Sequence, residues 1–166
     1  MTIYFATHES PIGELLLVSH GDALGGLYMP DHKYGPRIGD EWRRDDRLFG
    51  STKTQLDAYF AGELHRFELP LAPRGTTFQN AVWQALNAIP FGQTESYGAL
   101  AARLGKPKAS RAVGLANGHN PISIIVPCHR VVGANGSLTG YGGGIERKRW
   151  LLTHEARVAR DRPPDR

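Results

Sequence analysis

Three consecutive residues, Cys128, His129 and Arg130, carry the side chains that nucleophilic chemistry needs. Cys128 is the only cysteine among 166 residues, so it cannot form a disulfide bond within the chain. A histidine can accept the proton of a thiol, and a neighbouring cation favours the thiolate, which is the reactive form of cysteine. A lone cysteine is nevertheless more often an inert apolar side chain than a nucleophile. The triplet alone therefore indicates a candidate nucleophile and leaves the inert alternative open.

The segments on either side of the triplet are predicted to hold it in place. Residues 122–126 are almost entirely apolar, which predicts a buried strand that carries Cys128 at its end and continues through residues 131–132. Residues 134–137, Ala-Asn-Gly-Ser, then predict a hairpin turn. Residues 140–144 contain four glycines around Tyr141, which indicates a flexible loop that can approach another group closely.

Helical patterns occupy both ends of the second half of the chain. Thr76 and Gln79 have the spacing of a capping box before an apolar stripe of helical spacing over residues 78–89. A last helix is predicted over residues 145–156. Residues 157–166 alternate in charge and contain two prolines, so we expect them to be disordered.

Two short helices are predicted between these segments. Ser96 is expected to cap a helix over residues 97–104, and Ser110 a helix over residues 111–117. A tight turn joins them, which is typical of a helix-turn-helix. Such helix pairs also occur in proteins that bind no nucleic acid, so the pattern indicates DNA binding only in combination with other features.

The first half of the chain predicts a different architecture. Residues 30–47 are polar and predict a long loop, and no catalytic constellation is present. Apolar stretches between glycine and proline turns predict strands over residues 3–6, 14–19 and 23–29. Residues 52–64 have helical spacing and predict one helix. The sequence therefore predicts an α+β fold. A small antiparallel sheet with one helix occupies residues 1–72, and a helical domain occupies residues 73–156.

Charge is distributed unevenly between these two halves. Residues 1–72 carry seven Lys and Arg against eleven Asp and Glu, whereas residues 73–166 carry thirteen against five. A basic half beside an acidic half suggests that the second half binds a polyanion such as nucleic acid. The alternative is a basic tail, because four of the arginines lie within the last ten residues.

Composition also bears on the cellular compartment, on membrane association and on metal binding. No apolar span is long enough for a transmembrane helix, and the N-terminus lacks the pattern of a signal peptide. A lone free cysteine fits a reducing compartment, so we expect a cytoplasmic protein with no membrane partner. The chain has no cysteine cluster of the kind that holds zinc, and no metal is expected.

Several motifs together resemble those of the methylated-DNA–protein-cysteine methyltransferases, also called 6-O-alkylguanine-DNA alkyltransferases. The resemblance runs from about residue 77 to residue 155, while the first third of the chain matches only loosely. The matching motifs are Pro127-Cys128-His129-Arg130-Val131, Arg111-Ala112-Val113-Gly114, Gly118-His119-Asn120-Pro121, Ser96-Tyr97, Tyr141 with its glycines, and Leu151-Leu152-Thr153-His154-Glu155.

This resemblance implies a repair reaction and a role for each catalytic residue. An alkyl group would pass irreversibly from the 6-oxygen of guanine, and also from 4-O-alkylthymine, to Cys128 in a single turnover. His129 would take the thiol proton through a water, because neighbouring side chains on a strand point apart. Glu155 would orient His129 in the manner of a catalytic triad. Asn120 would tie the turn after the second short helix to the Cys128 segment, and Tyr97 would hydrogen-bond the guanine.

The resemblance also implies how DNA is held. The damaged nucleotide would flip out of double-stranded DNA, with Arg111 filling the gap and its helix lying in the minor groove. Small residues such as Ala112 would permit that close approach. The fold implied is a ribonuclease-H-like sheet domain joined to a winged helix-turn-helix domain, acting as a monomer without a cofactor. The remaining residues implied in substrate or DNA binding are Ser96, Gly114, Val131, Tyr141, Gly142 and Gly143.

Two other functions remain as alternatives at this point. A binding module of the same fold could recognise alkylated DNA without chemistry, although relatives of that kind lack the cysteine. A cysteine hydrolase would instead need an oxyanion site next to Cys128. Regulation of transcription, as in multidomain relatives, would need a zinc-bearing cysteine domain, and this chain has no other cysteine.

Overall fold

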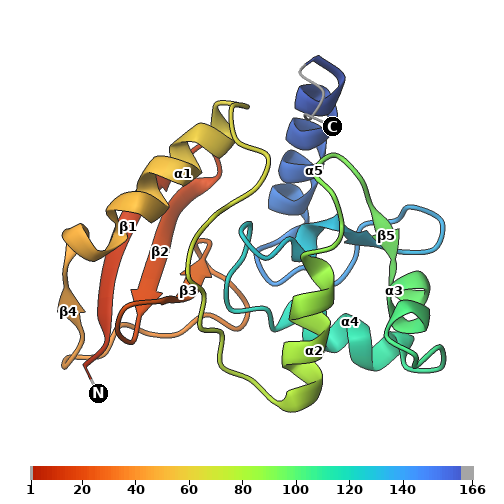
Figure 1. Cartoon of the computed structure of the whole chain (residues 1–166), viewed down its shortest axis with the longest axis horizontal. Coiled ribbons are helices and arrows are strands. Elements are labelled where there is room, and N and C mark those ends of the chain that lie inside the picture. The colour runs from red at the N-terminus through yellow and green to blue at the C-terminus, as the bar shows by residue number, and fades with distance from the viewer. Residues whose placement is uncertain (1, 162–166) are drawn as a thin grey trace.

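The computed structural model describes residues 2–161, which form a sheet-containing half and a helical half (Figure 1). In the first half, β1 (Tyr4–Ser10) pairs antiparallel with β2 (Gly13–Ser19), which pairs antiparallel with β3 (Leu24–Tyr28). A two-residue strand, β4 (Arg43–Arg44), joins β1 in parallel, so the strand order is β3-β2-β1-β4. The predicted antiparallel sheet is therefore present, with one short parallel strand at its edge.

One helical segment follows the sheet and covers it. A 3-10 helix, η1 (Asp46–Phe49), leads directly into α1 (Gly50–Phe60), which lies across the strands in Figure 1. Leu56 of α1 is completely buried, as are Leu15 and Leu17 of β2. The prediction that residues 30–47 form only a loop is wrong at its end, because β4 and the start of η1 fall within that range.

Short helices and one long helix build the second half. A two-stranded parallel pair joins β5 (Glu95–Ser96) to β6 (Val131–Val132). The expected helix-turn-helix is formed by α3 and α4, which pack against each other and, through α4, against α2. The helices span Thr77–Leu86 (α2), Tyr97–Arg103 (α3), Ser110–Gly118 (α4) and Ile145–Asp161 (α5).

Local capping explains where several of these helices begin. Thr76 accepts a hydrogen bond from the Gln79 backbone, and the Gln79 side chain accepts one from the Thr76 backbone, which confirms the predicted capping box. Ser96 accepts a hydrogen bond from the backbone of Ala99, as predicted. The prediction for Ser110 is wrong, because Ser110 is the first residue of α4 and no side chain caps that helix.

The apolar segment before Cys128 is not a strand, so that prediction is wrong. Residues 123–125 form tight turns, with the Val126 backbone N–H bonded to Ile122 O at 3.0 Å and Ile124 at a φ of 70°. The segment is apolar because it is buried between the two halves: Leu27 N donates to Pro121 O, and Ser123 N donates to Leu27 O. These bonds join the reactive segment to β3.

Two predictions near the C-terminus also fail. The turn at residues 133–137 forms, but it makes no hairpin, because β6 pairs in parallel with β5. Residues 157–161 continue α5 instead of being disordered, because Val158 is buried on the same helix face as Leu151. Residues 162–166 lie outside the described residues.

Candidate active site

Cys128 lies in a one-turn 3-10 helix, η2 (Cys128–Arg130), that directly follows Pro127. Its side chain is buried with the rest of the turn. The Cys128 backbone N–H donates to Val126 O at 2.8 Å, and its carbonyl accepts from Asn117 Nδ2 at 3.2 Å. The thiol is therefore fixed by a compact turn rather than by the end of a strand.

His129 and Glu155 form a buried pair beside this cysteine. The distance from His129 Nε2 to Glu155 Oε2 is 2.7 Å, and both side chains are almost completely buried. Burial by itself would raise the pKa of Glu155, but His129 and Arg130 outweigh it and hold that pKa well below its usual range. Because an ionised carboxylate can only accept hydrogen bonds, His129 Nε2 must carry the proton.

That tautomer leaves the other ring nitrogen of His129 as an acceptor. Within residues 2–161, Nδ1 is buried and has no hydrogen-bond partner. Burial lowers the pKa of His129 below its ordinary value, although Glu155 opposes that change. His129 is therefore neutral at rest, with a lone pair on Nδ1 that can take a proton.

Besides His129, the Glu155 carboxylate accepts from Arg130, Tyr59 and the Gly92 backbone, none of which the sequence assigns to it. Arg130 donates from Nε to Oε1 at 2.8 Å and from Nη2 to Oε2 at 3.1 Å, and its Nη1 donates to Ile89 O. Tyr59 of α1 donates its hydroxyl to Oε2 at 2.6 Å. The sequence predicts that Arg130 favours the thiolate, but its hydrogen bonds go to Glu155 and Ile89.

The thiol itself is held in its protonated form. Burial raises the pKa of Cys128, and the neighbouring side chains of Asn120, Lys148 and Tyr141 only partly oppose this rise. Reaction as a thiolate therefore requires a base.

Lys148 is a further buried cation that the sequence reasoning left outside the site. Its Nζ donates to Val131 O at 2.6 Å and to Thr139 O at 3.2 Å, and lies 3.4 Å from the Tyr97 hydroxyl. Burial lowers its pKa to about 8. In the sequence, no local pattern distinguishes Lys148 from its neighbours Arg147 and Arg149.

The structure shows how Asn120 and Tyr97 lie relative to the Cys128 segment. Asn120 Nδ2 donates to Val126 O at 2.8 Å, which ties the end of α4 to the Cys128 segment. The Tyr97 hydroxyl donates to Thr139 O at 2.9 Å, so Tyr97 faces the loop that leads to Tyr141. The predicted tie between the end of α4 and the Cys128 segment is present, and the roles of both residues in the reaction stay predictions.

The glycine-rich loop is pressed against the first half of the molecule. A β-carbon on Gly142 would lie 3.0 Å from Gly118 O and would collide with the ring of His32. Lys33 N donates to Gly142 O at 2.8 Å. A β-carbon on Gly143 would likewise collide with Met29. Close approach, rather than loose flexibility, explains the glycines here.

The helix α4 exposes its first three residues and Leu115 to solvent and buries the opposite face. Arg111, Ala112 and Leu115 are exposed, and Leu115 is 62% exposed. Val113 and Ala116 are buried against the core. Arg111 and Ala112 are predicted from the sequence and Leu115 is not, although its spacing of four residues from Arg111 places both on one helix face.

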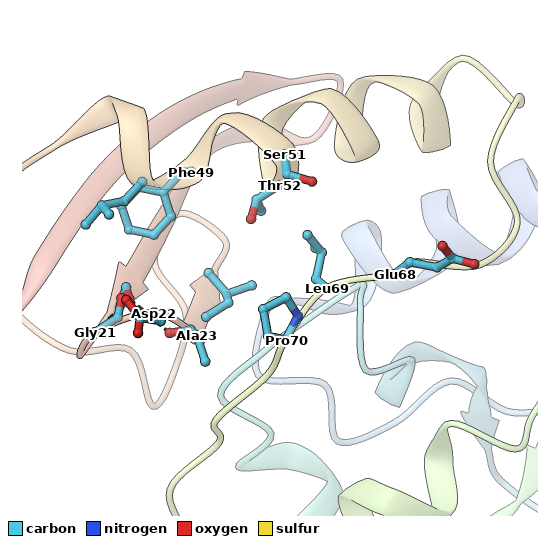
Figure 2. Close-up of a pocket in the computed structure, with 12 residues that line it drawn as sticks. Gly21, Asp22, Ala23, Phe49, Ser51, Thr52, Glu68, Leu69 and Pro70 are labelled. Carbon is cyan, nitrogen blue, oxygen red and sulfur yellow. Dashed lines mark hydrogen bonds between the residues drawn. The ribbon is translucent and has the colours of Figure 1, made fainter.

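A separate pocket lies wholly in the first half, between α1, the turn before β3 and residues 68–70 (Figure 2). Asp22 and Glu68 are its charged lining residues, and no thiol, imidazole or basic side chain lines it. Acidic groups repel a polyanion, so this pocket is not suited to hold DNA.

Two other features of the described chain bear on partners. Every helix within residues 2–161 is too short or too polar to cross a membrane. In the same range, no group of three or more His, Cys, Asp or Glu side chains is arranged to hold a metal ion.

Comparison with known proteins gives one consistent match over both halves. Residues 3–73 match the ribonuclease-like domain of 6-O-methylguanine DNA methyltransferase, and residues 77–157 match its DNA-binding domain. The chain is 56% identical over 153 residues to the methylated-DNA–protein-cysteine methyltransferase of Mycobacterium bovis, covering 92% of both chains. A second such protein, from Methanosarcina acetivorans, is 51% identical, covering 92% of this chain and 98% of its own.

Solved structures agree with these sequence matches. The crystal structure of Mycobacterium tuberculosis OGT in complex with DNA is 55% identical and superposes with a TM-score of 0.89, covering 93% of this chain and 94% of that one. The O6-methylguanine methyltransferase of the same organism gives a TM-score of 0.88 over 95% of this chain and 94% of its own, at 55% identity.

Proposed function

Because this chain belongs to the 6-O-methylguanine DNA methyltransferase family, we propose that Cys128 accepts the alkyl group and that His129 and Glu155 activate the Cys128 thiol. The observation that carries this proposal is the buried His129–Glu155 pair beside the only cysteine of the chain. Its geometry leaves His129 Nδ1 as a proton acceptor, while burial keeps the cysteine as a thiol that needs one.

The reaction follows from these protonation states. The thiol proton passes to His129 Nδ1 through a water, and the resulting imidazolium is stabilised by Glu155. The thiolate sulfur then attacks the alkyl carbon in line, so that a carbon–sulfur bond forms as the bond to the 6-oxygen of guanine breaks. Guanine leaves with the bonding electron pair and takes the proton from the His129 imidazolium, which returns to its neutral form. Tyr97 donates its hydroxyl to Thr139 O in the free protein and would turn that hydroxyl toward the guanine.

The product explains why the protein would act only once. The S-alkyl bond of a thioether is not readily broken, because a thiolate would have to leave. Each molecule therefore repairs one lesion and is consumed. A 4-O-alkylthymine presents a similar electrophilic carbon and is the second substrate that we propose.

The exposed face of α4 is the surface that we propose for DNA. The target carbon is inaccessible in a stacked duplex, so the nucleotide must flip out, and Arg111 would fill the gap that it leaves. Leu115 lies one turn further along the same helix and would contact the floor of the minor groove, where apolar side chains often wedge between base steps. Ala112 between them keeps the helix close to the groove.

The loop that follows would form the wall of the guanine pocket. Tyr141, Gly142 and Gly143 line it in this proposal, and Val131 O would accept from the guanine amine. That carbonyl already accepts from Lys148 Nζ, but a carbonyl oxygen has two lone pairs and can accept a second hydrogen bond.

The two alternative functions fit the site less well. A binding module without chemistry has no use for a buried imidazole–carboxylate pair beside a thiol. A hydrolase would need an oxyanion site, yet the Cys128 backbone N–H is already bonded to Val126 O.

The decisive experiment is to incubate the protein with duplex DNA that contains O6-methylguanine and to weigh the intact protein. We expect a gain of one methyl group, about 14 mass units, on Cys128, after which uptake stops at one equivalent. A Cys128→Ser variant should bind the duplex and gain no mass. Continued turnover, or transfer by the serine variant, would refute the assignment, and a duplex with 4-O-methylthymine tests the second substrate.

A further inference from the structure

The carboxylate of Glu155 receives a hydrogen bond from the opposite half of the molecule. Tyr59 belongs to α1 of the sheet-containing half and lies 96 residues before Glu155, yet its hydroxyl is 2.6 Å from Glu155 Oε2. Tyr59 is completely buried. Because Glu155 is ionised and can only accept, the tyrosine hydroxyl must be the donor.

The ring of Tyr59 is fixed from several sides. It meets Phe91 and His154 edge-on, at centroid distances of 6.0 and 5.3 Å, and Phe67 in a tilted contact at 5.5 Å. His154 Nε2 lies 2.9 Å from the Tyr59 backbone oxygen. Burial raises the pKa of Tyr59 well above its ordinary value, so the hydroxyl keeps its proton. The donor is therefore permanently present and rigidly aimed.

Tyr59 and His129 share the same carboxylate oxygen. Oε2 accepts from the Tyr59 hydroxyl at 2.6 Å and from His129 Nε2 at 2.7 Å. We propose that Tyr59 is a positioning residue for alkyl transfer: its hydroxyl fixes the Glu155 oxygen that in turn orients His129 toward the thiol. This inference rests on the proposed function. It makes the sheet-containing half a contributor to the chemistry of the helical half.

The other groups around this pair remain when the hydroxyl is removed. Arg130 of η2 donates to both Glu155 oxygens, and Gly92 N, from the loop after α2, lies 3.4 Å from Oε1. Lys148 of α5 is a second nearby cation that acts on His129. Without Tyr59, Oε2 has one donor fewer and interacts more strongly with His129, so His129 should hold a proton more tightly.

A buried tyrosine that merely satisfies its hydroxyl would behave differently. Its loss would lower stability but leave the proton affinity of His129 unchanged. The dependence of transfer on pH therefore separates a positioning role from a structural one.

The experiment compares wild type with Tyr59→Phe, which keeps the ring and removes only the hydroxyl. The rate of transfer from free O6-benzylguanine, which avoids DNA binding, is measured between about pH 5 and pH 9. Because transfer needs neutral His129, we expect the acid limb of the profile to move up by roughly half to one pH unit. The Glu155 oxygen that orients His129 is then less firmly fixed, so the plateau rate should also fall by about tenfold.

A control variant and a double variant complete the design. Phe49→Leu changes a buried side chain of the same half, away from Glu155, and should lower stability without moving the profile. In a Glu155→Gln background, Tyr59→Phe should have no further effect on the profile, because Tyr59 acts through Glu155.

The outcomes distinguish this inference from the function on which it rests. Absence of transfer by the wild-type protein would refute the proposed function and this inference with it. Wild-type transfer with superimposable profiles for wild type and Tyr59→Phe would refute the role of Tyr59 alone.

Discussion

Replacing Glu155 by glutamine tests the core of the proposed site with almost no change of shape. Each oxygen of the carboxylate accepts from Arg130, and Oε2 also accepts from Tyr59 and His129. A glutamine amide has one oxygen and one NH2 group. The NH2 group would replace one of the two accepting oxygens and would face N–H or O–H donors. The Glu155→Gln variant therefore loses hydrogen bonds and also leaves the Arg130 charge buried without its partner.

The expected cost follows from that geometry. Breaking a buried ion pair by removing one partner costs roughly 3–5 kcal/mol. For a chain of 166 residues, 1 kcal/mol corresponds to about 2–4 °C in Tm, so Tm should fall by roughly 10 °C. If the amide NH2 faces His129, the tautomer reverses and Nδ1 gains a proton. The base is then lost, and the transfer rate should fall by about 10²- to 10⁴-fold.

Calorimetry and the initial rate of methyl uptake by intact mass measure the two effects. The matched control is Glu146→Gln on the same helix, because Glu146 is 87% exposed and pairs only with Arg149 within the described chain. That variant should change Tm by less than about 2 °C. A Glu155→Gln protein that resembles this control in both Tm and rate would refute the reasoning.

Three further predictions concern the DNA surface, acid stability and the glycine-rich loop. Arg111→Ala should slow repair of duplex DNA at least about tenfold more than reaction with free O6-benzylguanine; equal losses on both substrates would remove its role in base flipping. The pKa of Glu155 is held below its unfolded value, so its contribution to stability is present above about pH 4.3 and is lost as pH falls. Denaturant unfolding at a series of acidic pH values should therefore show a steeper loss for wild type than for Glu155→Gln, and parallel slopes would contradict this. Gly142→Ala would place a β-carbon 3.0 Å from Gly118 O and should cost about 1–3 kcal/mol in thermal unfolding. Gly98→Ala, which meets nothing within 4 Å, should be neutral or stabilising.

Features that depend on neighbours in the sequence were predictable, and features that depend on distant contacts were not. The capping box of Thr76 and Gln79 needs only residues three positions apart, so the start of α2 could be located. The strand prediction for residues 122–126 is wrong because burial between two halves and burial within a sheet favour the same residue types.

The candidate site shows the same division. Cys128 and His129 are adjacent, and their side-chain types alone suggested a nucleophile and a base. The hydrogen bond from Tyr59 to Glu155 could not be predicted, because the two residues lie 96 positions apart and the sequence around Tyr59 predicts only an ordinary helix. Glu155, taken without the resemblance, would have been read as a solvated helix face, whereas the structure buries it.

The unusual backbone of Ile124 has a consequence for how the protein folds. A β-branched residue at a φ of 70° is conformationally unfavourable by about 1–3 kcal/mol and persists only where surrounding contacts impose it. Here those contacts include the hydrogen bonds between Leu27 and the residues on either side of Ile122. The reactive segment therefore reaches its native conformation only when the sheet has docked. The two halves should therefore unfold in one cooperative transition, and undocking of the sheet should abolish nucleophilicity at Cys128 even where the surrounding helices stay formed.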